Sequence, residues 1–214
     1  MKADLPRVIY LSSTEIGQDL LNWFKTLPCQ VILAETGNRK ISEFPSYDLG
    51  ISFLYTHQIP TSEFHTPYKW VNFHPGPLPE FRGRNLAYHA IMEDSPHFGA
   101  TIHYMDCEFD TGEIIEVSRF PVLPCYTAGD LVSISHAKLV ELFKKYLPKL
   151  LVGKVASRPQ GENGRYYRRT PIKDEIELTE EQLRRIRAIT VMPHYFPRVN
   201  VGGTWYRLVP DEQD

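Results

Sequence analysis

Two polar side chains with complementary chemistry stand two residues apart in the segment WVNFH, as Asn72 and His74. Side chains two apart on a strand point to the same face, so a strand here would aim an amide and an imidazole into one space. Asp110 follows a second apolar run, 99–105, in a turn that reads Phe-Asp-Thr-Gly. We expect two strand ends to bring these three groups together, which predicts a site for acid and base chemistry.

Short apolar runs predict the strands that position these groups. Buried strands are expected over residues 7–12, 30–35, 49–55 and 70–74. A helix over 16–27, capped by Ser13 or Thr14, separates the first two runs, and such an opening is typical of a parallel, Rossmann-like sheet. Two later runs, 99–106 and 113–122, alternate apolar and polar residues as antiparallel or edge strands do. The sequence therefore predicts an α/β fold with a mostly parallel sheet.

Capping residues predict two further helices in the same unit. Asn85 is placed to cap a helix over 86–93, and Thr127 to begin a long amphipathic helix that ends near 151. Asp130 lies in the first turn of the long helix, where its charge favours the helix dipole. We expect residues 1–155 to form one catalytic domain.

Residues 156–214 change character and predict a short C-terminal extension. The extension opens with a polar, basic and aromatic loop and continues with a helix that ends at Ile189. Thr179 and Gln182 have the spacing of a capping box at the start of that helix. A β-hairpin is expected to follow, turned at Gly202–Gly203.

The composition argues against several classes of protein. The formal net charge is −2, which disfavours a nucleic-acid binder held by general basicity. No apolar run approaches the roughly 20 residues of a membrane span, and the first residues lack a signal-peptide core. The cysteines, Cys29, Cys107 and Cys125, are scattered and form no metal motif. They favour a reducing compartment, so a cytoplasmic protein without a metal is expected.

Eleven positions in the central segment share the order and spacing of a known family: Asn72, His74, Pro75, Leu78, Pro79, Gly83, Gly99, Thr101, His103, Asp110 and Gly112. This pattern resembles the formyltransferases that use N10-formyltetrahydrofolate, and the resemblance extends loosely over residues 6–155. Through the segments GPLP and GRN, it resembles in particular the enzymes that formylate nucleotide-linked amino sugars. Residues 36–48 leave no room for the additional strand and helix of most relatives, so we expect a trimmed version of the fold.

The resemblance implies a role for each residue of the proposed site. Asn72 would donate its amide to the oxyanion, and His74 would act as base toward the amine or as a second donor. Asp110 would hold the imidazole and relay protons through water. Whether His74 or Asp110 removes the proton stays open. We interpret His103 as a supporting histidine.

The resemblance also implies where two ligands bind. An apolar slot for the co-substrate N10-formyltetrahydrofolate is expected at Phe53, Leu54, Tyr55, Cys107, Glu108 and Phe109. The nucleotide-linked amino sugar is expected at Arg82, Gly83, Arg84, Asn85, Tyr166, Tyr167 and Arg168. Arginines before a helix and aromatic groups suit phosphate and a base, although a solvated turn and linker are the alternative. Relatives bend at Leu78–Pro79, so a cis bond is expected there, and the hairpin is a candidate dimer interface.

Three alternatives to a sugar N-formyltransferase remain at this point. A glycinamide ribonucleotide formyltransferase would carry a phosphate-binding loop after the first strand, where this chain has SSTEIGQDL. A formyltetrahydrofolate hydrolase shares the same polar set but has an extra regulatory domain. A catalytically silent binding module on the same scaffold is the alternative from a different class, and the intact Asn72, His74 and Asp110 argue against it.

Overall fold

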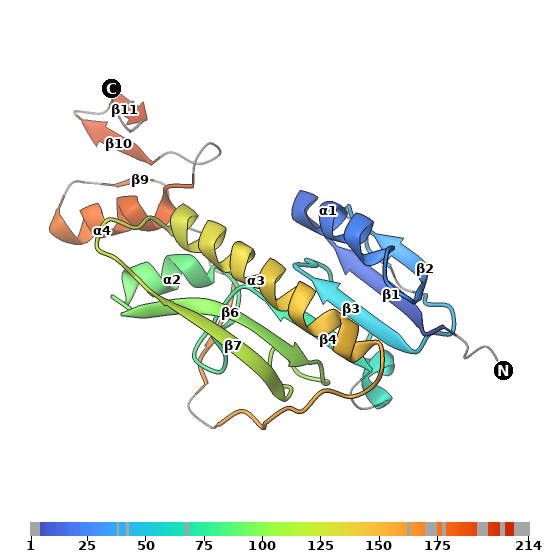
Figure 1. Cartoon of the computed structure of the whole chain (residues 1–214). Coiled ribbons are helices and arrows are strands. Elements are labelled where there is room, and N and C mark those ends of the chain that lie inside the picture. The colour runs from blue at the N-terminus through green and yellow to red at the C-terminus, as the bar shows by residue number, and fades with distance from the viewer. Residues whose placement is uncertain are drawn as a thin grey trace.

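A six-stranded sheet forms the centre of the computed structural model (Figure 1). The structure describes residues 5–37, 39–41, 43–66, 69–161, 164–169, 175–176, 179–191, 197–201 and 204–207. The strands of the sheet are β1 (Arg7–Ser12), β2 (Gln30–Glu35), β3 (Leu49–Phe53), β4 (Trp70–His74), β6 (His97–Tyr104) and β7 (Ile114–Pro121). Their order is β2-β1-β3-β4-β6-β7, parallel through β4 and then antiparallel. The predicted α/β fold with a mostly parallel sheet is confirmed.

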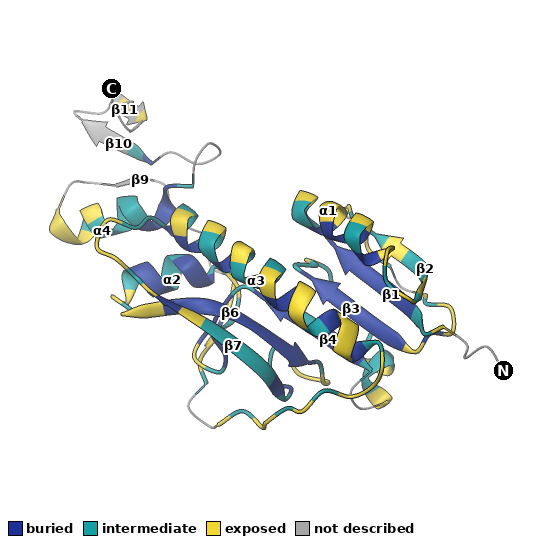
Figure 2. Ribbon diagram, in the orientation of Figure 1, coloured by how far each residue is buried: buried dark blue, intermediate teal, exposed yellow. Residues whose placement is uncertain are grey.

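Two helices cover one face of this sheet, α1 (Glu15–Phe24) and α3 (Ala128–Leu150), as Figure 1 shows. Both begin at the predicted caps, because Thr14 accepts from the Gly17 N–H and Thr127 forms a capping box with Asp130. Apolar residues from both helices and from the sheet form one buried cluster that includes Phe24, Phe73 and Phe143. Figure 2 shows that β1, β3, β4 and β6 are largely buried while β2 and β7 lie at the edges. This face is packed core, so a site must lie on the other face.

The other face packs against η1 (Thr61–His65) in a cluster that contains Ile9 and Trp70, whereas the short helix α2 (Leu86–Met92) packs beside α3 and shares a buried cluster with Leu131. At the start of α2, Asn85 has a left-handed backbone and its side chain makes no capping hydrogen bond. The prediction of a side-chain cap at Asn85 was therefore wrong, since a residue with this backbone does not aim its side chain back at the first turn. The expected trimming between β2 and β3 is borne out in the described residues of that connection, which contain no helix or strand.

The C-terminal extension packs against the sheet domain. Its elements are β8 (Tyr166–Tyr167), β9 (Glu175–Ile176), α4 (Glu180–Ile189), β10 (Arg198–Val201) and β11 (Thr204–Arg207). β8 pairs in parallel with β5 (Arg82–Gly83), and Tyr167 and Ala188 share a buried cluster with α2. β10 and β11 pair antiparallel as predicted, whereas Gly202–Gly203 lies outside the described residues. Thr179 precedes α4 without a side-chain capping hydrogen bond, so the predicted capping box was wrong.

None of the helices within the described ranges combines the length and the apolarity of a membrane-spanning segment.

Candidate functional site

The register between β4 and β6 places the polar residues of both strands side by side. Asn72 pairs with His103, and His74 pairs with Thr101. Because β6 runs antiparallel to β4, the end of β6 lies beside the beginning of β4. The loop after β6 must therefore fold back along β4 to bring Asp110 to the other residues. The prediction that two strand ends deliver the site is corrected: it lies on a sheet face under a returning loop.

Asp110 lies at the centre of the polar cluster. Its Oδ2 accepts from the Gly83 N–H at 2.9 Å, and its Oδ1 lies 3.4 Å from His74 Nδ1 and 3.7 Å from His103 Nε2. Burial alone would raise the pKa of this carboxyl group. The rings of His74 and His103 and the N–H of Gly83 outweigh burial, so the pKa of Asp110 lies below its ordinary value. The carboxylate is consequently ionised at neutral pH.

His103 is buried and neutral. Burial lowers the pKa of His103 to about 4, although the Asp110 carboxylate acts in the opposite direction. Its Nδ1–H donates to the Tyr104 carbonyl at 2.7 Å, which leaves Nε2 as an acceptor 3.2 Å from Asn72 Nδ2. This arrangement supports the interpretation of His103 as a residue that orients its neighbours.

His74 is also buried, with 3% of its surface exposed. Its Nε2–H donates to the Phe81 carbonyl at 2.7 Å, because a carbonyl oxygen only accepts. The remaining ring nitrogen, Nδ1, faces Asp110. A proton that His74 takes up would therefore lie on Nδ1, between the imidazole and the carboxylate.

Asn72 presents its amide nitrogen to two acceptors of the cluster. One amide proton meets His103 Nε2, and the other meets Asp110 Oδ1 across a long contact of 3.5 Å. The long contact is weak, so that proton is the one available to a ligand. Asn72 is also more exposed than His74 and His103.

Thr101, a residue of the quoted motif without an assigned role, holds the proline-rich loop in place. Its hydroxyl is fully buried, donates to the Gly76 carbonyl at 2.7 Å and accepts from the Leu78 N–H at 3.0 Å. The Leu78–Pro79 bond in this loop is cis, as predicted. Alternation along β6 places Thr101 on the same face as His103, and this is the signal that identifies it.

The expected folate residues divide into buried and exposed groups. The Phe53 ring is fully buried in the core, so this residue has only its backbone to offer a ligand. Tyr55 turns its hydroxyl to the Arg39 carbonyl at 2.9 Å. Leu54 has a left-handed backbone and packs on the core. On the other side, Cys107, Glu108 and Phe109 form an exposed stretch of the loop that carries Asp110.

The expected acceptor residues are also divided. The Tyr167 ring is buried and stacks on Phe81 and His89, so the expectation that it binds a base is corrected. Tyr166 is 48% exposed and lies 6.4 Å from the Phe109 ring.

The arginines and Gly83 border the same region. Arg84 is exposed and donates to the Thr56 carbonyl at 2.9 Å. Arg168 is also exposed and has an interaction partner of its own. Gly83 has φ +98°, and a Cβ there would meet the Tyr167 carbonyl at 2.1 Å. Only glycine therefore fits where β5 meets β8. The structure brings Arg82, Tyr166 and Phe109 together but keeps Arg84 on the side of Thr56.

A cavity of about 390 Å³ lies beside the Asp110 loop. Its lining residues are Arg82, Cys107, Glu108, Phe109, Thr111 and Tyr166. Residues expected for two different ligands thus meet in one space, whose volume is within the usual range for small-molecule sites. Among the described residues, no group of histidine, cysteine and carboxylate side chains is arranged to hold a metal ion.

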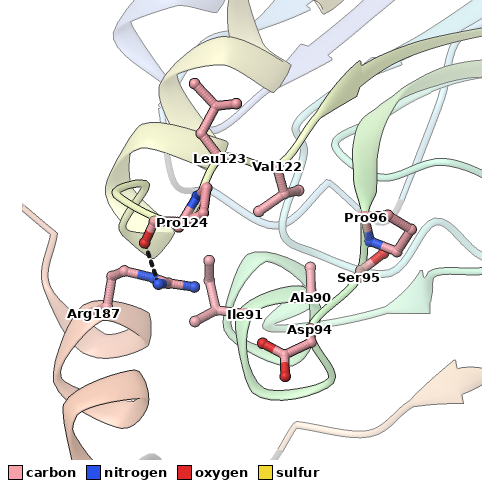
Figure 3. A pocket seen from close by; sticks show the side chains of 9 residues that line it. All are labelled: Ala90, Ile91, Asp94, Ser95, Pro96, Val122, Leu123, Pro124 and Arg187. Carbon is pink, nitrogen blue, oxygen red and sulfur yellow. Dashed lines mark hydrogen bonds between the residues drawn. The ribbon is translucent and has the colours of Figure 1, made fainter.

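A smaller cavity of about 170 Å³ lies between α2 and α4 (Figure 3). Its walls are mainly apolar, and Arg187 closes one side by donating to the Pro124 carbonyl. No residue of the Asp110 loop lines this cavity, whereas Phe109 and Thr111, the two neighbours of Asp110, line the larger one. We therefore take the larger cavity as the candidate site.

Comparison with known proteins identifies a formyltransferase domain. Residues 48–147 match a family model described as formyl transferase. A methionyl-tRNA formyltransferase of Thermobifida fusca is 32% identical over 150 residues, which are 68% of this chain and 48% of that protein. The chain spans about half the length of the curated relatives it matches.

Solved structures with the same fold include two formyltransferases. A 4-N formyltransferase from Francisella tularensis has a TM-score of 0.80 at 23% identity, over 98% of both chains. The formyltransferase PseJ from Anoxybacillus kamchatkensis, solved with UDP-4,6-dideoxy-4-formamido-L-AltNAc and tetrahydrofolate, has a TM-score of 0.65 at 24% identity, over 76% of this chain and 85% of that chain. This chain thus contains a formyltransferase domain and resembles the nucleotide-sugar N-formyltransferases in fold.

Proposed function

We propose that the formyltransferase domain of this chain transfers the formyl group of N10-formyltetrahydrofolate to the amine of a nucleotide-linked amino sugar, with a 4-amino-4-deoxy sugar favoured. One observation carries the reaction type: Asp110 is an ionised carboxylate, only 15% exposed, in contact with Asn72 and His74. A carboxylate in such a position accepts a proton from an amine that attacks a carbonyl carbon.

The three residues divide the work of the transfer. The reaction forms a bond between the acceptor nitrogen and the formyl carbon, breaks the bond to N10, and moves one proton from the amine to N10. Asp110 removes that proton, because its carboxylate is ionised. His74 does not, because its Nε2–H already donates to the Phe81 carbonyl. His74 Nδ1 shares the proton with Asp110. The Asn72 amide N–H that makes the long contact with Asp110 donates instead to the formyl oxygen, as negative charge develops on that oxygen.

The folate co-substrate supplies the formyl group and the departing nitrogen. The residues that would hold it are the backbone after β3, at Leu54 and Tyr55, and the exposed loop at Cys107 and Phe109. The two segments lie on the same side of the sheet, because Tyr55 and Met105 pack on the same hydrophobic cluster and the loop continues from Met105 to Asp110. The exposed Phe109 ring offers an apolar wall. The segments therefore fit a flat, partly apolar ligand.

The acceptor is supported by the cavity beside Asp110. Arg82 provides a fixed guanidinium for phosphate, and Tyr166 with Phe109 provides two aromatic surfaces for a base. The Anoxybacillus structure, solved with a UDP-linked 4-formamido sugar, supports a 4-amino sugar in particular, and the Francisella protein is named a 4-N formyltransferase. The curated relatives support a second candidate acceptor, methionyl-tRNA, because they are methionyl-tRNA formyltransferases.

A competition assay separates these acceptors. Nucleotide-linked 4-amino sugar, free amino sugar, glycinamide ribonucleotide and methionyl-tRNA are offered together with formyltetrahydrofolate. We expect the nucleotide-linked sugar to be formylated first, because only it provides a pyrophosphate for Arg82 and a base for Tyr166. Preference for glycinamide ribonucleotide or methionyl-tRNA would replace the proposed acceptor. No turnover of any amine would instead favour a silent binding module.

Tyr166→Ala is expected to raise KM for the nucleotide-linked sugar about tenfold and to leave kcat near the wild-type value, because stacking on a base contributes about 1–3 kcal/mol to binding. The side chain is half-exposed, so its removal does not open the core. The matched control is Leu123→Ala, which removes a similarly exposed side chain beside the cavity of Figure 3. A raised KM in the control and a normal KM in Tyr166→Ala would move the acceptor to that cavity.

A further inference from the structure

Gln160 belongs to the extension and makes four hydrogen bonds with its side-chain amide. Its Nε2 donates to the carbonyl oxygens of Asp110 at 2.9 Å and Gly112 at 2.7 Å. Its Oε1 accepts from Arg82 Nε at 3.1 Å and Nη2 at 2.8 Å. An amide has two donor hydrogens and two acceptor lone pairs, so this side chain is fully used.

The nitrogen side of Gln160 holds the backbone that carries the catalytic carboxylate. Asp110 has φ +58°, a left-handed conformation that costs a residue other than glycine roughly 1–2 kcal/mol. The loop on its N-terminal side, at Cys107 and Phe109, is exposed and provides little packing. The two bonds from Gln160 therefore fix the direction of the Asp110 and Gly112 carbonyls and keep the Asp110 side chain aimed at the sheet.

The oxygen side of Gln160 holds the cation of the candidate acceptor site. Gln160 accepts from two N–H groups of the Arg82 guanidinium, and Arg82 also lines the cavity with Phe109 and Tyr166. The next residue, Gly83, donates its backbone N–H to Asp110 Oδ2. The acceptor-binding cation and the catalytic carboxylate are thus joined twice, through Gln160 and through the chain between Arg82 and Gly83.

We propose that Gln160 is a positioning residue that sets the Arg82 guanidinium for the phosphate of the acceptor and, with its other end, the loop that carries Asp110. This inference rests on the proposed function, because it assigns the acceptor phosphate to Arg82. It makes the extension a part of the active site. Substitutions at one side chain should then separate acceptor affinity from turnover.

Gln160→Glu is the variant that separates the two ends. A carboxylate still accepts from Arg82, with the added strength of a charged pair, but it cannot donate to the Asp110 and Gly112 carbonyls. We expect kcat to fall about 10- to 100-fold through misplacement of Asp110, with KM for the acceptor within about threefold of the wild type. Gln160→Ala loses both ends, so it should lower kcat similarly and raise KM about tenfold.

Two further variants complete the comparison. Arg82→Met removes only the cation and should raise KM about tenfold with kcat within about threefold. Ser157→Ala removes a hydrogen bond to Glu113 in the same segment and should change neither constant. The inference would be overturned if Gln160→Glu kept the wild-type kcat. It would also be overturned if kcat and KM changed in the same way in Gln160→Glu, Gln160→Ala and Arg82→Met.

Hydrogen exchange of residues 105–113 tests the same inference without turnover. Exchange in this loop should accelerate in Gln160→Glu and Gln160→Ala but not in Arg82→Met, while the thermal midpoint of unfolding shows that each variant is folded. If the wild type formylates no amine, the proposed function fails, and the exchange pattern still decides the role of Gln160. Unchanged exchange in Gln160→Glu would contradict that role whatever the activity.

Discussion

Asp110→Asn is expected to lower kcat at least about 100-fold, the scale of a general acid–base contribution, and to leave the protein folded. The amide is nearly isosteric with the carboxyl group. Its oxygen still accepts from the Gly83 N–H, and its nitrogen can donate to His74 Nδ1. However, an amide takes up no proton at neutral pH. The measurement is kcat for formyl transfer to the amino sugar, with thermal unfolding as the check on folding.

The pH dependence supplies a second readout for the same variant. Because the pKa of Asp110 lies below its ordinary value, the part of the acid limb of kcat that is due to Asp110 should lie below that ordinary value in the wild type. The acid limb due to Asp110 should be absent from the residual activity of Asp110→Asn. Asp19→Asn, which changes an exposed carboxylate on α1, is the matched control and should behave as the wild type.

His74→Asn is expected to reduce kcat by at least about 100-fold as well, because no group then shares the proton with Asp110. Asparagine places a polar atom near the position of Nδ1 but cannot reach the Phe81 carbonyl as Nε2 does. The buried carbonyl would lose its partner, which costs about 1–3 kcal/mol of unfolding free energy. Turnover and urea unfolding are measured on the same preparation.

His74→Gln separates chemistry from stability in this pair. Glutamine places a donor near the position of Nε2, so it should keep the bond to the Phe81 carbonyl and more of the stability. Its turnover should still be as low as that of His74→Asn, because neither amide holds a proton. Near-normal turnover in both Asp110→Asn and His74→Asn would refute the assignment of the site to these residues.

Local patterns in the sequence determined much of the framework. The two-residue spacing of Asn72 and His74 on an apolar strand placed both side chains on one face, and the structure agrees. Thr127 and Asp130 marked the start of α3, because a capping box depends on residues three apart. The side-chain caps predicted at Asn85 and Thr179 did not form, and at Asn85 the reason is its left-handed backbone.

The sequence by itself therefore determined the α/β sheet, the long helix and the identity of the three polar residues that the family pattern contains. Only the tertiary structure decided how they meet. The antiparallel register put His103 beside Asn72, and the returning loop brought Asp110 to the Gly83 N–H, 27 residues away. It also buried Tyr167 and joined Gln160 to Arg82 across 78 residues. Such contacts leave no periodic pattern in the local sequence. They result from the packing of distant segments, and that packing depends on many small contact energies summed over the whole fold.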